Sequence, residues 1–359
     1  MATQGAVVAP ADFDGDGDTD LFVGSRVGAG GYGQSPRSFL LENDGSARYT
    51  DVTEEVAPGL RSPGLVTDAV WADVWGDDAP ELVVVGEWMP ITVFARPGGR
   101  ASADSRLVER TEAAGLAGTE GWWTALHAAD LNGDGASDLI AGNLGLNSRL
   151  RATPETPVRL YVHDFNGDGA PEPILTRYNE GRSYPWVRRD ELLDRMPTLD
   201  ERFPTYDAYG DSQVEDLFPA QELRDATVKE ARLFASVYVE NRGDSTFAVE
   251  PLPTRAQLAP VYGILAHDLT GNGRREVMLG GNFYGVRSRQ GRYDASYGTI
   301  LQRDQTGHWS ALPPGESTMY LDGEVRALRH LERPGGRPIV LVARNDARPQ
   351  VVRLRSPEK

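Results

Sequence analysis

The sequence lacks cysteine altogether, and it has lysine at only two positions, Lys229 and Lys359. The absence of cysteine excludes disulfide bonds, thiolate metal sites and a cysteine nucleophile. It leaves the compartment open, because a reducing cytosol and many secreted bacterial proteins are both compatible with a cysteine-free chain. No hydrophobic run approaches the ~18 residues that a membrane span requires, and the first residues lack the charged-then-apolar order of a signal peptide. We therefore expect no membrane span.

Positive charge is also scarce, since 37 basic residues face 53 acidic ones and the net charge is −16. Such a chain disfavours polyanionic partners, so neither nucleic acid nor an anionic membrane surface is an expected ligand. The 40 glycines and 24 prolines argue against a core of long helices. A length of 359 residues with 40% hydrophobic composition nevertheless suffices for a large core.

An acidic nine-residue loop with a central Gly recurs along the chain, and such self-similarity indicates a repeat architecture. Three copies keep the pattern, at 12–20, 130–138 and 164–172. Two degenerate copies follow the same template, at 73–81 and 268–276. Most copies are followed by a strand-like run, a Gly-containing turn and an aromatic residue, which is typical of a β-hairpin.

Each repeat therefore predicts four short strands, with the acidic loop between the first two. Units of roughly 50 residues with four strands are typical of propeller blades. The predicted fold class is all-β, a single β-propeller domain over residues 1–359 with six or seven four-stranded blades. The expected blade limits are about 5–57, 66–113, 121–157, 158–253, 261–313 and 320–355. Helical spacing within the fourth unit predicts a small helical insertion at about 180–230.

The acidic loops place oxygen-bearing side chains at positions 1, 3, 5 and 9 and a backbone carbonyl at position 7. Hard oxygen ligands at this spacing are what calcium prefers, and close carboxylates repel one another unless a cation lies among them. An EF-hand is excluded, because its bidentate Glu at position 12 is replaced by Val23 within a strand-like run. The alternative is a turn held by hydrogen bonds. The predicted metal ligands are Asp12, Asp14, Asp16, Asp18, Asp20, Asp130, Asn132, Asp134, Ala136, Asp138, Asp164, Asn166, Asp168, Ala170 and Glu172.

The loop at 268–276 keeps fewer carboxylates and carries two neighbouring arginines, so it is a weaker candidate. We expect about three Ca²⁺ ions, or four if this loop also binds one through Asp268, Thr270, Asn272 and Glu276.

The repeat resembles the FG-GAP/VCBS repeat of the integrin α-subunit type of β-propeller. The segments Gly121–Thr124, Ala141–Ser148 and Gly281–Gly298 are similar to the repeat region of bacterial proteins that often carry an ASPIC/UnbV domain. This resemblance implies a calcium-stabilised propeller for recognition, located outside the cytoplasm (secreted, periplasmic or on the cell surface). It also implies that the chain is part of a longer protein.

Catalytic motifs are absent from the sequence: it has no nucleophile elbow, no phosphate loop and no HExxH. Two of the five histidines, His163 and His267, directly precede an acidic loop, which favours a structural role. Two long loops form a candidate ligand face, one at 26–37 and one after the fifth loop copy. The second loop contributes Arg287, Arg289, Arg292 and Tyr293, and arginine with tyrosine is suited to a carboxylate, sugar or peptide.

The leading hypothesis is a non-catalytic, calcium-binding propeller module that recognises a protein or a carbohydrate. One alternative is a propeller-fold lyase or hydrolase acting on an acidic polysaccharide, which predicts a pocket where a histidine meets an arginine and a tyrosine. Another is a structural spacer in a larger surface protein, which predicts no concave Arg/Tyr-lined site. Fold alone does not choose between them, because function belongs to the site.

Overall fold

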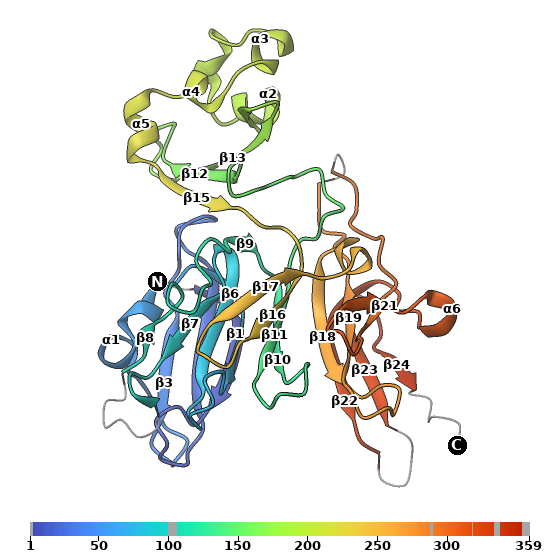
Figure 1. Cartoon of the computed structure of the whole chain (residues 1–359). Helices are drawn as coiled ribbons and strands as arrows, with labels where there is room; N and C mark the ends of the chain where they lie inside the picture. The colour runs from blue at the N-terminus through green and yellow to red at the C-terminus, as the bar shows by residue number, and fades with distance from the viewer. Residues whose placement is uncertain (1–2, 100–105, 288–289, 318, 334–337, 354–359) are drawn as a thin grey trace.

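The computed structural model describes residues 3–99, 106–287, 290–317, 319–333 and 338–353 (Figure 1). The chain is all-β, and most of its strands form four-stranded antiparallel sheets. No helix in these ranges is long and apolar enough to cross a membrane.

Five antiparallel sheets follow one another in an arc. The first contains β1 (Thr3–Ala11), β2 (Asp20–Gly28), β3 (Phe39–Asn43) and β4 (Tyr49–Asp51). The second contains β5 (Leu65–Ala72), β6 (Glu81–Met89), β7 (Thr92–Ala95) and β8 (Val108–Glu109), and β9 (Gly121–Trp122) also pairs with β6. The third contains β10 (Ala125–Ala129), β11 (Asp138–Gly142), β16 (Val237–Asn241) and β17 (Phe247–Pro251).

The arc continues with a fourth sheet of β18 (Val261–His267), β19 (Glu276–Gly281), β20 (Thr299–Arg303) and β21 (Trp309–Ala311). The fifth has three strands, β22 (Glu324–Leu331), β23 (Ile339–Asn345) and β24 (Gln350–Arg353). Short helices lie in the connections: α1 (Thr53–Val56), η1 (Pro58–Arg61), η4 (Thr254–Gln257) and α6 (Pro314–Ser317).

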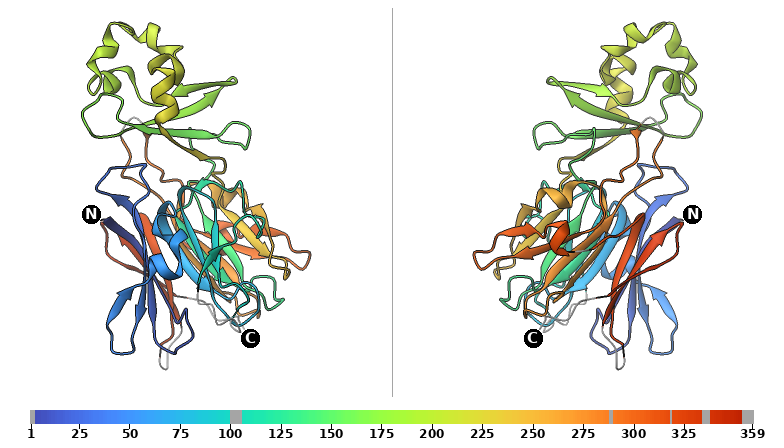
Figure 2. Two further views of the ribbon diagram at one scale, coloured as in Figure 1. Left: turned by 90° about the vertical axis from the view of Figure 1, so that its left-hand side faces the viewer. Right: turned by 90° about the vertical axis from the view of Figure 1, so that its right-hand side faces the viewer.

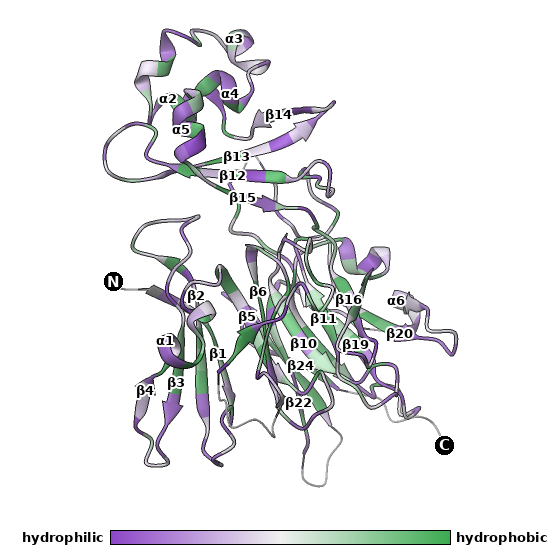
Figure 3. Cartoon of the chain, turned by 60° about the vertical axis from the view of Figure 1, so that its left-hand side comes forward, coloured by the Kyte–Doolittle hydropathy of each residue, from purple (hydrophilic) through white to green (hydrophobic). Residues whose placement is uncertain are grey.

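The first strands of the five sheets contact one another in the order β1, β5, β10, β18, β22. A separate hydrophobic cluster fills each of the four spaces between consecutive sheets, as with Phe22 and Leu82 between the first two. Strands that pack on both faces are hydrophobic along their length, as Figure 3 shows for β10 and β11, whereas the loops are hydrophilic. The arc is therefore held together face to face.

Equivalent glycines of the repeat permit this close packing. A Cβ on Gly24 would lie 2.5 Å from Val66 Cγ1 of the second sheet, and one on Gly280 would lie 2.7 Å from Val325 Cγ1 of the fifth. A Cβ on Gly142 would lie 2.5 Å from a backbone oxygen of the fourth sheet. Glycine at this position thus serves the contact between sheets.

The chain forms a sixth sheet between β11 and β16 of the third sheet, which are neighbours in space but far apart in the sequence. Its strand order is β14 (Arg182–Pro185), β13 (Glu172–Asn179), β12 (Val158–His163), β15 (Thr227–Ala231). The predicted helical segment is confirmed and lies between β14 and β15, as α2 (Arg189–Leu193), η3 (Pro197–Asp200), α3 (Tyr206–Gly210), α4 (Val214–Leu217) and α5 (Ala220–Asp225). This insert, residues 158–231, lies above the strand ends on one side of the arc, at the top of the view in Figure 1 (Figure 1; Figure 2).

The predicted limits 121–157 and 158–253 are wrong, because strand pairing groups these residues differently. β16 pairs with β11, with Val239 opposite Leu139, so the hairpin of β16 and β17 completes the third sheet. The insert is also no blade of the predicted kind, since its first strand, β12, is flanked on both sides, by β13 and β15. The loop at 164–172 therefore belongs to the insert.

Candidate ligand pocket and acidic loops

The acidic loops share one hydrogen-bond pattern in all five copies. The amide of position 6 donates to the carboxylate of position 1 at 2.9–3.2 Å. The amide of position 2 donates to the carboxylate of position 9 at 2.8–3.1 Å. The carboxylates at positions 1 and 9 thus close the turn themselves, through local side-chain to backbone bonds.

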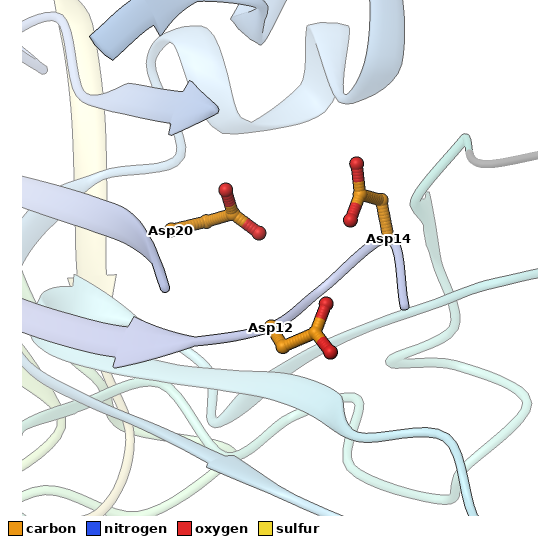
Figure 4. Close-up of side chains that lie close together, drawn as sticks. All are labelled: Asp12, Asp14 and Asp20. Atoms are coloured by element: carbon orange, nitrogen blue, oxygen red, sulfur yellow. The ribbon is translucent and has the colours of Figure 1, made fainter. Parts of the chain in front are cut away.

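The loop at 12–20 is the strongest candidate metal centre. One carboxylate oxygen from each of Asp12, Asp14 and Asp20 lies within 4.8 Å of the other two, and the three groups surround a common space (Figure 4). Burial, together with the charges of Asp16 and Asp12, raises the pKa of Asp14 above its usual value. Burial likewise raises the pKa of Asp20. The donor set consists of hard oxygens, which fits Ca²⁺.

The other predicted metal loops differ at position 3. The amide nitrogens of Asn132 and Asn166 donate to Asp134 and Asp168, at 2.9 and 3.1 Å. Of the residues that the structure describes, only those of loop 12–20 bring three acidic or histidine groups into ligand spacing. The calcium ligands predicted at 130–138 and 164–172 therefore stay predictions.

The degenerate loop at 268–276 is closed by its own side chains. Thr270 Oγ1 and Asn272 Nδ2 donate to Glu276 Oε1, at 2.9 and 3.0 Å. The amides of Gly271 and Asn272 both donate to Asp268 Oδ1, at 2.6 and 3.0 Å. Hydrogen bonds thus connect the side chains at positions 3 and 5 to the carboxylate at position 9.

A cavity of about 570 Å³ faces the insert, on the side of the arc opposite the acidic loops of the sheets. Each of the five sheets contributes one equivalent residue to this cavity. In the first four sheets it lies six residues before position 1 of the acidic loop. In the fifth sheet it lies six residues before Glu332, which stands at the place of position 1. In four sheets this residue is the extra one at a β-bulge in the first strand. A bulge redirects one side chain without breaking the strand, which explains why these residues meet. They form the pocket floor and are Ala6, Thr67, Thr124, Tyr262 and Arg326.

A polar network forms one wall of the pocket. Arg26 Nη2 donates to Glu87 Oε1 at 2.6 Å, and the Tyr32 hydroxyl donates to Glu87 Oε2 at 2.7 Å. The Tyr32 oxygen in turn accepts a bond from Trp88 Nε1 at 2.8 Å. Burial and the adjacent Glu87 carboxylate raise the pKa of Tyr32 well above its usual value, so its hydroxyl stays protonated. The network is fixed before any ligand arrives.

Aromatic rings from distant segments form the rest of the wall. Trp122 packs edge to face on Trp88 and Phe234, with centroids 5.0 and 5.5 Å apart. Its Nε1 is buried and has no hydrogen-bond partner. The insert contributes Trp186, which lies under the Arg177 guanidinium at 4.9 Å. Trp122 is partly buried, whereas its neighbour Trp123 is fully buried.

The fourth and fifth sheets close the floor with an Arg–Tyr pair. The guanidinium carbon of Arg326 lies 4.4 Å from the centroid of Tyr262, and Arg326 Nη2 donates to Glu324 Oε1 at 2.7 Å. Burial raises the pKa of Tyr262 to about 12. The raised pKa values of Tyr32 and Tyr262 thus make both hydroxyls unsuited to act as a base near neutral pH.

The structure brings together part of the predicted ligand face. Arg287 and Tyr293 line the pocket, together with Arg26 and Tyr32 from the other predicted loop. Arg292 lies over Tyr284 instead, at 5.0 Å, and Arg289 falls outside the described residues. Sequence reasoning missed several lining residues, although a common offset from the acidic loops marks the floor positions; the missed residues include Thr67, Glu87, Trp186, Tyr262 and Arg326.

The histidines lie away from this pocket, and none is among its described lining residues. Burial, with Arg329 and Arg275 nearby, lowers the pKa of His127 to about 4. His267 and His330 stack with centroids 3.8 Å apart. The described lining thus has no meeting of a histidine with arginine and tyrosine, which the enzyme hypothesis predicted.

No protein-family model and no curated protein matches the chain. Among solved structures, a lectin of Agrocybe aegerita that recognises non-reducing terminal N-acetylglucosamine aligns over 99% of this chain and 81% of its own. The identity is 14% and the TM-score 0.31. The V. cholerae biofilm matrix protein Bap1 aligns over 96% of this chain and 66% of its own, with 10% identity and a TM-score of 0.30. Likeness this low carries no argument about fold or ligand.

Proposed function

We propose that the chain is a non-catalytic recognition module that binds a carbohydrate in the pocket facing the insert. The observation that carries this is the convergence of one equivalent residue from every sheet of the arc on a single cavity. We infer that the five sheets are blades of a β-propeller, in place of the six or seven predicted, and that the cavity lies on its axis. A volume of about 570 Å³ suits a small ligand unit, such as one or two sugar rings.

The lining chemistry supports a saccharide over the other ligand expected from the sequence, a protein. Aromatic rings offer flat apolar faces, and the fixed Arg26 and Glu87 groups offer a donor and an acceptor for hydroxyls. A protein partner would need a larger, flatter surface. The concave lining by Arg287 and Tyr293 also argues against a structural spacer, for which no such site is expected.

Recognition without catalysis fits the titratable groups of the pocket. Glycoside hydrolysis in most families uses two carboxylates across the bond, and Glu87 is the one acidic residue among the described lining residues. Each oxygen of Glu87 already accepts a hydrogen bond. A tyrosine base for a lyase would need a lowered pKa, whereas the pKa values of Tyr32 and Tyr262 are raised.

The test is binding of a panel of oligosaccharides to the full chain, measured by calorimetry. Trp122→Ala is expected to weaken binding at least about tenfold, because it removes an aromatic ring from the pocket wall. Tyr206→Ala is the matched control, since Tyr206 is an exposed aromatic on α3 away from the pocket. The proposal is wrong if no saccharide binds, or if both variants bind as the wild type does.

We also propose that loop 12–20 holds a structural Ca²⁺ ion through Asp12, Asp14 and Asp20. Support comes from the three clustered oxygens and from the raised pKa of Asp14, because both are relieved when a cation lies among the carboxylates. Bound calcium would neutralise these charges and fix the turn. A calcium requirement in the millimolar range would suit a location outside the cytoplasm.

Thermal unfolding of chelator-treated protein tests this second proposal. Calcium at about 100 times its dissociation constant should add about 2.7 kcal/mol to the free energy of unfolding, and magnesium should add less. The stabilisation should vanish in Asp14→Ala and persist in Asp207→Ala, an exposed aspartate on α3. Equal calcium stabilisation of both variants would rule out loop 12–20 as the site.

A further inference from the structure

Every arginine among the described lining residues of the pocket already has a carboxylate partner. Arg26 pairs with Glu87 at 2.6 Å, and Arg326 pairs with Glu324 at 2.7 Å. Arg287 pairs with Glu191 of the insert. Each arginine charge is therefore balanced by a carboxylate, from the lining in the case of Glu87 and from just outside it in the cases of Glu191 and Glu324.

Recruiting Arg26 or Arg326 to a ligand carboxylate would leave its glutamate partner without a counter-charge. The side chains of Glu87 and Glu324 are only 14% and 8% exposed, so either would become a poorly solvated, unpaired charge. Removing one partner of a buried ion pair is costly for this reason. The net charge of −16 adds a long-range repulsion against polyanions.

The pocket instead presents groups suited to hydroxyls. The Trp122 ring and the Glu87 carboxylate both line the pocket. Each Glu87 oxygen accepts bonds from a single partner residue, Arg26 or Tyr32, and a carboxylate oxygen has capacity for more. A sugar hydroxyl can donate to this remaining acceptor capacity.

We infer, on the basis of the proposed saccharide binding, that the ligand is an uncharged sugar unit and that acidic sugars are rejected. The sugar ring packs on Trp122, and one of its hydroxyls donates to Glu87. The floor residues Ala6, Thr67 and Thr124 are small, in contrast to Tyr262 and Arg326. The acidic polysaccharide considered as a substrate from the sequence does not fit this arrangement.

The experiment compares matched pairs of oligosaccharides that differ only in oxidation at C6: glucose and glucuronic acid, galactose and galacturonic acid, mannose and mannuronic acid. Calorimetry with the full chain at about 0.15 M salt is expected to show at least one neutral member binding tenfold or more tightly than its acid. Its dissociation constant should change less than twofold between 50 and 500 mM salt, because no net charge is engaged.

Glu87→Gln keeps the size of the side chain and leaves Arg26 without its charge partner. This variant is expected to bind the neutral sugar at least fivefold more weakly and to lose most of the discrimination against the acid. Glu230→Gln is the matched control, since Glu230 also pairs with arginines, Arg159 and Arg232, but lies outside the pocket lining.

The outcomes separate this inference from the proposed function. Equal or tighter binding of the acids by the wild type overturns the inference and leaves saccharide recognition standing. Failure of both series to bind overturns both. If Glu87→Gln does not fold, the paired panel and the salt dependence of the wild type still decide the matter.

Discussion

Gly142→Ala is expected to destabilise the fold although it adds a single methyl group. The new Cβ would lie 2.5 Å from the carbonyl oxygen of Val261 and 3.1 Å from its Cβ and Cγ1. The nearest atom belongs to the backbone of β18, so no side-chain rotation relieves the contact. The same stretch also holds two bonds between sheets, since Thr124 Oγ1 donates to Val261 O and Val261 N donates to Asn143 O at 3.2 Å.

The cost follows from these contacts. Overpacking a tight interior costs about 1–3 kcal/mol, and weakening two hydrogen bonds adds roughly 1 kcal/mol. We therefore expect the free energy of unfolding to fall by about 2–4 kcal/mol, measured by urea denaturation followed by tryptophan fluorescence. Unfolding 359 residues carries an entropy of about 0.75 kcal/mol/K, so the melting temperature should fall by only about 3–5 °C.

Gly210→Ala is the matched control for this substitution. Gly210 ends α3, a Cβ there would meet nothing within 4 Å, and its backbone conformation is open to alanine. Alanine at this site should leave stability unchanged or raise it by up to about 1 kcal/mol. If Gly142→Ala is as stable as Gly210→Ala, close contact between sheets is not the reason for glycine at this repeat position.

Four further substitutions probe other features of the fold. Gly280→Ala should cost about 1–3 kcal/mol, and adding Val325→Ala should recover part of it, with a coupling of about 1 kcal/mol in a urea double-mutant cycle. Because the pKa of His127 is lowered to about 4, its contribution to stability is complete above about 6.5 and is lost as pH falls toward 4; His127→Leu should reduce this acid sensitivity by about 2–3 kcal/mol in urea titrations at several pH values. Tyr32→Phe removes the bond to Glu87 and should lower unfolding free energy by about 1–2 kcal/mol by the same assay.

The sequence was sufficient for the local features. The spacing of acidic residues predicts the loops, because positions 1 and 9 make the turn through bonds to nearby amides. Helical spacing predicts the helices between Arg189 and Asp225 for the same reason, that the pattern is local. Loop composition also predicted that Arg287 and Tyr293 belong to a ligand face, and both line the pocket.

Local sequence patterns did not predict which distant strands pair with each other. Val239 pairs with Leu139 across the whole insert, and nothing near either residue distinguishes this hairpin from one that continues the preceding strands. Glu87 and Tyr262 were missed for a related reason. Each is unremarkable in its own strand, and their role depends on the arc that brings separate sheets to one cavity.

The two sides of the arc differ because each kind of strand connection always lies at the same strand ends. The acidic loops join the first strand of a sheet to the second on one side of the arc. Each second strand therefore ends on the other side, where the pocket lies. Long connections grow from those second-strand ends: residues 29–38 after β2, the insert after β11 and residues 282–298 after β19. Second strands of 5–9 residues separate the two ends by roughly 15–30 Å. Insertions on the pocket side can therefore reshape the pocket lining without disturbing the loops that join the opposite ends of the strands.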